Sequence, residues 1–231
     1  TYNVSVVTCT NRPQFFKHLV ANYRRQLYRG KELIIVLNRD GMNLAAYRRK
    51  VRAYPDISVY KLKETTSLGR CLNFAVRRAK YPYIAKFDDD DYYSPYYLIE
   101  QMAAIRRTGA DIVGKRNHLI FFEGRNLLIQ RFPGRRNRFV SLVTGGSILF
   151  RKRVFRRVRF ENRSLGEDVS FLWKCRRRGF RIYSTSIYNF VGIRRENKNS
   201  HTWTAHDGYL LKGSRIVAKT ANYRRIADRP V

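Results

Sequence analysis

The chain has 231 residues, of which 44% are apolar, enough for one large domain with a hydrophobic core. No apolar run approaches the roughly 18 residues of a membrane span, and three cysteines without metal-ligand spacing favour a reduced, cytoplasmic protein. The 48 lysines and arginines exceed the 17 aspartates and glutamates and give a net charge of +31, which indicates either a polyanionic partner or a generally basic, solvated surface.

The first half of the sequence alternates short apolar runs with segments of helical period. We expect strands at residues 3–8, 32–38, 57–62 and 83–87, and helices at residues 15–28, 44–53, 68–79 and about 95–109. Ser67 is a candidate N-cap for the third of these helices. Such alternation predicts an α/β fold with a mostly parallel sheet and helices on both faces.

The second half changes character, because its expected strands are not separated by long helices. These strands are residues 111–115, 119–122, 127–132, 147–151, 182–183 and 187–191, and the clear helix is residues 166–178. We therefore expect two halves of one domain, residues 1–110 and a smaller mixed-strand half at 111–205. After Arg194 the pattern weakens, and we expect a partly mobile tail at 206–231.

Four consecutive aspartates, Asp88 to Asp91, follow the strand expected at 83–87. Open α/β sheets bind ligands where their strands end, and neighbouring carboxylates repel one another unless a cation lies between them. In an extended backbone Asp88 and Asp90 would point one way, and Asp89 and Asp91 the other. An Asp-x-Asp pair suits Mg²⁺, which takes one or two carboxylates and completes its shell with water and phosphate oxygens. The alternative is an ordinary acidic loop or helix N-terminus.

A second acidic pair, Glu167-Asp168, opens the helix expected at 166–178. We expect an apolar stripe of Val169, Leu172 and Trp173 on this helix, with Asp168 at its edge and facing a cleft. The helix dipole favours ionised acids in a first turn, and an ionised carboxylate can accept a proton from a hydroxyl group. The alternative is that both acids only cap the helix.

Four segments together resemble glycosyltransferase family 2, whose members have the nucleotide-sugar-binding GT-A fold. They are VSVVTCTNR at 4–12, ELIIVLN at 32–38, LGRCLN at 68–73 and IAKFDDDD at 84–91, the last followed by Pro95. No segment is decisive alone, but their order and spacing are specific, and the resemblance covers about residues 3–203. It departs from the family after the second strand, where Asn38-Arg39-Asp40 replaces an acidic pair that contacts the base.

The resemblance implies an inverting transfer of a sugar from a nucleoside diphosphate, with a UDP-sugar as the expected donor, to a hydroxyl acceptor, assisted by Mn²⁺ or Mg²⁺. It implies that Asp168 is the catalytic base with Glu167 beside it, and that the metal is held by Asp88, Asp90 and His201. The implied nucleotide-sugar-binding residues are Thr8, Asn11, Arg12, Asn38, Asp40, Gly69, Arg70, Asn73, Asp88, Asp89, Gly146 and Arg194.

Some of these roles have plain alternatives. His201 could be a surface or packing residue, and Arg194 with Arg195 could belong to a solvated loop instead of clamping the diphosphate. Gly145-Gly146 could let the backbone approach the acceptor closely or form an ordinary turn.

The basic surface suggests an anionic acceptor, such as a glycan or coat polymer, and a location in the cytoplasm or at the inner membrane surface or cell envelope. One rival hypothesis is a nucleic-acid- or polyanion-binding protein, but the carboxylates would repel phosphates and no helix-turn-helix, zinc or RNA-recognition signature appears. We therefore expect no specific nucleic-acid partner. Another rival is a catalytically inactive module that docks on an anionic polymer.

Overall fold

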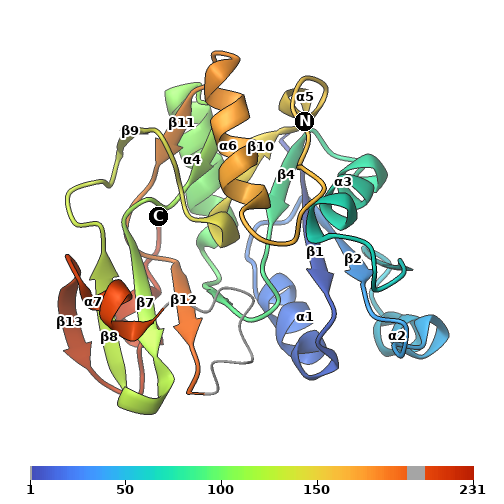
Figure 1. Cartoon of the computed structure of the whole chain (residues 1–231), viewed down its shortest axis with the longest axis horizontal. Coiled ribbons are helices and arrows are strands. Elements are labelled where there is room, and N and C mark those ends of the chain that lie inside the picture. Colours follow the sequence, from blue (N-terminus) through green and yellow to red (C-terminus); the bar gives the residue numbers. More distant parts are fainter. Residues whose placement is uncertain (1, 197–205) are drawn as a thin grey trace.

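The computed structural model describes residues 2–196 and 206–231 and contains two β-sheets (Figure 1). The larger sheet has, in spatial order, the strands β3 (Ile57–Lys61), β2 (Lys31–Leu37), β1 (Val4–Thr10), β4 (Tyr83–Lys86), β10 (Leu149–Arg151), β6 (Ile112–Gly114), β11 (Ile182–Ser184) and β9 (Arg138–Val140). The strands β1 to β4 are parallel, as predicted. Strand β10 is antiparallel to both of its neighbours, and β9 is antiparallel to β11.

Helices cover both faces of this sheet and form a hydrophobic core on each. One core includes α1 (Phe16–Arg24), α2 (Leu44–Val51) and α4 (Tyr97–Thr108). The other includes α3 (Leu68–Arg78), α5 (Lys152–Phe155) and α6 (Glu167–Arg177). Alternate residues of β2 divide between the two, since Leu33 and Ile35 join the first core and Ile34 the second. This explains why β2 is a continuous apolar run: a parallel strand is buried on both faces.

The smaller sheet has the order β13 (Arg215–Lys219), β8 (Leu127–Arg131), β7 (His118–Phe122), β12 (Phe190–Arg194) and β5 (Tyr92–Tyr93). Strand β7 is antiparallel to β8 and parallel to β12, and β5 pairs with β12. The four aspartates connect β4 of the larger sheet to β5 of the smaller one, so they lie where the two sheets meet.

Several expected elements differ from the structure. Helix α1 ends at Arg24 and follows a short 3-10 turn, η1 (Pro13–Phe15), whereas we expected one helix over 15–28. The strand expected at 187–191 is β12, which begins three residues later. Further 3-10 turns, η2 (Glu123–Arg125) and η3 (Gly145–Ser147), precede β8 and β10. The other expected bounds shift by a few residues at either end.

The tail at 206–231 has regular structure, although the sequence pattern weakens after Arg194. The tail contains α7 (Asp207–Leu211), β13 and α8 (Arg224–Ala227), and β13 pairs with β8. Its sequence signal is weak because β13 is an edge strand and most of its side chains are exposed. In the described part of the chain no helix is long and apolar enough to cross a membrane.

Candidate active site

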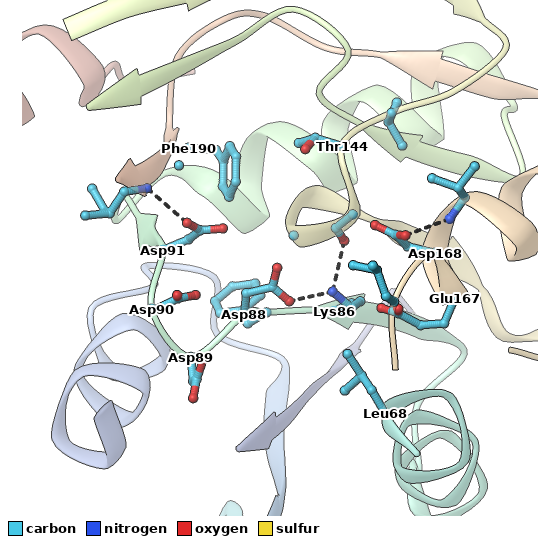
Figure 2. A pocket seen from close by; sticks show the side chains of 18 of the residues that line it. Leu68, Lys86, Asp88, Asp89, Asp90, Asp91, Thr144, Glu167, Asp168 and Phe190 are labelled. Atoms are coloured by element: carbon cyan, nitrogen blue, oxygen red, sulfur yellow. Dashed lines mark hydrogen bonds and ion pairs between the residues drawn. The ribbon is translucent and has the colours of Figure 1, made fainter. Parts of the chain in front are cut away.

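A cavity of about 620 Å³ opens at the carboxyl ends of β1 and β4 and is lined by residues of both sheets (Figure 2). Its volume is ordinary for a small-molecule or cofactor site. The expected site residues that line it are Asn11, Arg12, Asn38, Asp88, Asp89, Asp90, Gly146, Glu167, Asp168 and Arg194. Residues far apart in the sequence therefore meet at one site, including both acidic pairs.

Asp89 and Asp90 are tied to the end of β1. Arg12 forms ion pairs with both carboxylates, and the Thr10 hydroxyl donates to Asp89 Oδ2 at 2.5 Å. Arg195, just after β12, lies 3.3 Å from Asp90 Oδ2. Burial raises the pKa of the Asp89 carboxyl, while the charge of Arg12 opposes that rise. These contacts hold the turn after β1, the aspartate run and the end of β12 together.

The aspartates do not alternate in direction, so the expectation from an extended backbone is wrong. The chain bends through residues 89–91, which places both Asp89 and Asp90 on Arg12 and both Asp88 and Asp91 near Gly146. A Cβ atom on Gly146 would lie 2.9 Å from Asp88 Oδ2 and 2.8 Å from Asp91 Oδ2. Asp91 is structural, since its Oδ1 accepts the Ile193 backbone N–H at 3.0 Å.

Lys86, at the end of β4, lies between the two acidic groups (Figure 2). Its side chain is 4% exposed, and its Nζ lies 2.5 Å from Asp88 Oδ1 and 3.4 Å from the carbonyl oxygen of Gly145. Burial alone would lower the pKa of Lys86, but the carboxylates of Asp88, Glu167 and Asp168 outweigh it and raise that pKa. Lys86 is therefore a fixed positive charge between carboxylates.

Asp168 and Glu167 form the first turn of α6. Asp168 Oδ1 accepts the Val169 backbone N–H at 2.7 Å, and a Cβ atom on Gly145 would lie only 1.6 Å from Asp168 Oδ2. The glycine therefore makes room for this carboxylate. The expected apolar stripe on α6 is only partly correct, because Val169 and Trp173 are 46% and 53% exposed while Leu172 is buried.

Glu167 is buried, and burial together with the charge of Asp168 raises its pKa to about 7, although Lys86 opposes the shift. A raised native pKa favours the protonated form of Glu167. The carboxyl therefore lowers the stability of the folded protein as the pH rises from its unfolded pKa, near 4.3, through 7.

We expect Glu167→Gln to raise the free energy of unfolding at pH 8 by roughly 1–3 kcal/mol and to have no such effect below pH 4. Denaturant unfolding of both proteins across this pH range measures the difference. A constant difference between the two proteins at all pH values would contradict the assignment.

Five expected nucleotide-sugar residues are not among the cavity-lining residues of the described chain: Thr8, Asp40, Gly69, Arg70 and Asn73. The amide of Asn73 exchanges two hydrogen bonds with the Phe160 backbone, at 2.8 and 3.0 Å. The Gly69 N–H donates to Arg163 at 3.0 Å. The start of α3 therefore holds the segment that leads into α6. Asp40 is exposed and accepts from the Glu64 N–H at 3.2 Å, and His201 lies outside the described residues.

Sequence reasoning missed some residues of the cavity. Lys86 and Thr10 touch the aspartates directly. A signal for Lys86 was present, since a lone lysine in an otherwise apolar buried strand needs an anionic partner. The cavity lining also includes Arg116, His118, Arg131, Phe132 and Tyr209, and nothing local in the sequence groups these five.

The residues present fit a divalent cation held jointly with a diphosphate. Asp88 and Asp90 line the cavity, with side chains 35% and 13% exposed. No group of three metal-binding side chains occurs among residues 2–196 and 206–231. Two carboxylates suffice for Mg²⁺ when phosphate oxygens and water supply the other ligands.

A mostly parallel sheet, with helices on both faces and a polar cavity at the carboxyl ends of its strands, defines the GT-A class of nucleotide-sugar-binding folds. The chain belongs to glycosyl transferase family 2, which it matches over residues 5–180. No curated protein sequence matches the chain significantly.

Solved structures share the fold. TarS 1-349 of S. aureus in complex with UDP-GlcNAc is 19% identical, with a TM-score of 0.66 over 84% of this chain and 59% of that one. The mannosyltransferase PcManGT of Pyrobaculum calidifontis, in complex with GDP-Man and Mn²⁺, is 17% identical, with a TM-score of 0.60 over 83% and 56%. The chain thus spans about three fifths of the length of these structures.

Proposed function

We propose that the chain is a metal-dependent, inverting glycosyltransferase that moves a sugar from a nucleoside diphosphate to a hydroxyl acceptor. The observation that carries this proposal is the convergence of the aspartate run and of Glu167-Asp168 on one cavity, with Lys86 between them. Membership of family 2 supports the same class of reaction.

The donor would lie at the acidic end of the cavity. Asp88 and Asp90 would hold Mn²⁺ or Mg²⁺, which neutralises the diphosphate when bound, and Arg194 and Arg195 extend from β12 toward the same place. The Asn38 amide donates to Lys63 and Thr66 carbonyls at 2.9 and 3.2 Å, which fixes its carbonyl oxygen as an acceptor for a base edge. We infer UDP as the nucleotide, and UDP-GlcNAc in a structural neighbour agrees with this choice.

Asp168 would act as the base. Its carboxylate takes the proton of the acceptor hydroxyl, the oxygen attacks the anomeric carbon, and the bond to the diphosphate breaks on the opposite face, which inverts the configuration. Gly145 leaves room for this carboxylate, and Gly146 leaves room for those of Asp88 and Asp91. Lys86 lies between Asp88 and the Glu167-Asp168 pair, and its charge offsets the repulsion among these carboxylates.

A thermal-shift screen of nucleoside diphosphates tests the donor site. A ligand that binds only the native state raises the apparent stability, by about 2.7 kcal/mol at one hundred times its Kd. We expect UDP with Mn²⁺ to raise the melting temperature more than UDP or Mn²⁺ alone. The absence of a shift with every nucleotide and metal tried would contradict the proposed donor site.

The net charge of +31 keeps polyanion binding as a second candidate function. Electrostatic binding to a phosphate backbone weakens steeply with salt. If a filter-binding titration shows only weak, salt-sensitive affinity for nucleic acid, the partner of the basic surface is instead an anionic acceptor or a membrane or envelope surface. We propose that the enzyme acts at such a surface.

A further inference from the structure

The cavity lining contains two groups of charged residues. Asp88 to Asp91, Glu167 and Asp168 form the acidic end, where Arg12, Lys86 and Arg195 pair with the aspartates. The second group comes from the ends of β7 and β8. His118 and Arg131 are paired across these antiparallel strands. Arg116 lies just before β7 and Phe132 just after β8. We call Arg116 and Arg131, with the aromatic ring of Phe132, the basic wall; Arg135 lies close enough to Arg116 to affect its charge.

The arginines of the basic wall differ in their partners from the arginines that contact the aspartates. Arg12 and Arg195 form ion pairs with Asp89 or Asp90. Within the described chain, Arg116 and Arg131 have no carboxylate partner, and the Arg116 guanidinium makes no hydrogen bond. A half-buried guanidinium without an anion is costly, so such a group marks an anion site that the protein leaves to a ligand.

The structure also fixes these side chains in place. The Arg116 guanidinium stacks on the Phe132 ring, 3.8 Å from its centroid. Arg131 is 5% exposed and donates to the carbonyl oxygens of Tyr209, Leu210 and Lys212 at 3.1, 2.8 and 3.1 Å. Arg131 thus contributes positive charge from a fixed position, whereas the guanidinium N–H groups of Arg116 remain available to a ligand.

The titration behaviour of the wall agrees with clustered positive charge. Burial and the nearby charges of Arg131 and Arg135 lower the pKa of Arg116. Burial also lowers the pKa of His118 to about 4, so this imidazole is neutral at pH 7. It can serve as a hydrogen-bonding group beside the arginines without adding to their charge.

We propose that the basic wall, with Arg116 as its contact residue, binds an oxyanion of the acceptor, so that the acceptor carries a phosphate or carboxylate group near its reactive hydroxyl. This assignment of the ligand as the acceptor rests on the proposed glycosyl transfer. Charge separation within the cavity supports it, because a nucleoside diphosphate with its cation suits the acidic end and leaves the basic wall for the other substrate.

Ligand-observed NMR titrations test the proposal, with glycerol, glycerate and glycerol 1-phosphate as probes. The full chain is used, saturated with UDP and diamagnetic Mg²⁺ so that the donor site is filled. We expect wild-type protein to bind at least one anionic probe about tenfold more tightly than glycerol, and Arg116→Gln to raise the Kd of that probe roughly 10- to 100-fold. A preference for glycerol 1-phosphate would identify a phosphate, and a preference for glycerate a carboxylate.

Three further variants test whether the loss of affinity is specific to the Arg116 guanidinium. Arg116→Lys should recover only part of the affinity, because an ammonium lacks the planar fork of a guanidinium. It also tests the site should Arg116→Gln fold poorly. Arg135→Gln should weaken binding less than Arg116→Gln does. Arg77→Gln removes the same charge from the exposed face of α3 and should leave the Kd unchanged.

Equal probe affinity in wild type and Arg116→Gln, or an equal loss in Arg77→Gln, would overturn the proposal. A loss of UDP binding in Arg116→Gln would also overturn it, because Arg116 would then belong to the donor site. Failure of the proposed function is visible separately, as a wild-type protein that binds no nucleoside diphosphate.

Discussion

Asp168→Asn should lower kcat for sugar transfer by about 10²- to 10⁴-fold, the range typical of a lost general base. The amide has nearly the same shape as the carboxylate and can still accept the Val169 N–H through its oxygen. It cannot take a proton from an acceptor hydroxyl. Steady-state transfer assays with saturating donor measure the change.

Donor binding is the control for this variant. Because Asp168 lies at the first turn of α6 and not among the aspartates after β4, the Kd for UDP with Mn²⁺ should change little. Near-normal transfer by a variant that binds donor would show that Asp168 is not the base. A large loss of donor affinity would instead place Asp168 in the donor site.

Lys86→Met should destabilise the protein by roughly 1–3 kcal/mol at pH 8, because buried Glu167 and the partly exposed Asp88 lose their nearby cation. The change removes the cation that lies 2.5 Å from Asp88 Oδ1 and that opposes the rise in the pKa of Glu167. The loss should shrink at pH 5, where Glu167 is protonated and one of the unpaired charges disappears. Urea unfolding at the two pH values measures it.

Two comparisons separate this electrostatic effect from simple packing damage. The double variant Lys86→Met/Glu167→Gln should recover part of the stability, since it also removes a carboxyl. Lys115 is fully buried and pairs with Glu100 at 2.7 Å but does not line the cavity, so Lys115→Met should be at least as destabilising as Lys86→Met without altering UDP binding. No recovery in the double variant would contradict the role given to Lys86.

The first half of the fold could be predicted because each of its strands carries its own signal. Strand β2 is apolar throughout, and α3 begins at Ser67, whose hydroxyl accepts the Arg70 N–H at 3.3 Å. The elements of the smaller sheet are less visible: β5 has two residues, and β13 is exposed at an edge. Their pairing is decided by contacts between segments distant in the sequence.

The same distinction applies to the site. The aspartate run and Glu167-Asp168 could be found because like charges gathered in a basic chain need an explanation. The bend that turns Asp89 and Asp90 onto Arg12 could not be predicted from the sequence, because it depends on contacts with β1 and with the segment after β12. The basic wall was also hidden, since only the pairing of β7 with β8 and the docking of α7 bring Arg116, Arg131 and Tyr209 together.

The most direct test of the central claim is an NMR assay of sugar transfer by the wild-type protein. The protein is incubated with a panel of nucleotide sugars and the hydroxyl probes named above, with Mn²⁺ or with a chelator. We expect a cation-dependent product whose anomeric configuration is opposite to that of the donor. A folded protein that consumes no nucleotide sugar, or a product that retains the donor configuration, would contradict it.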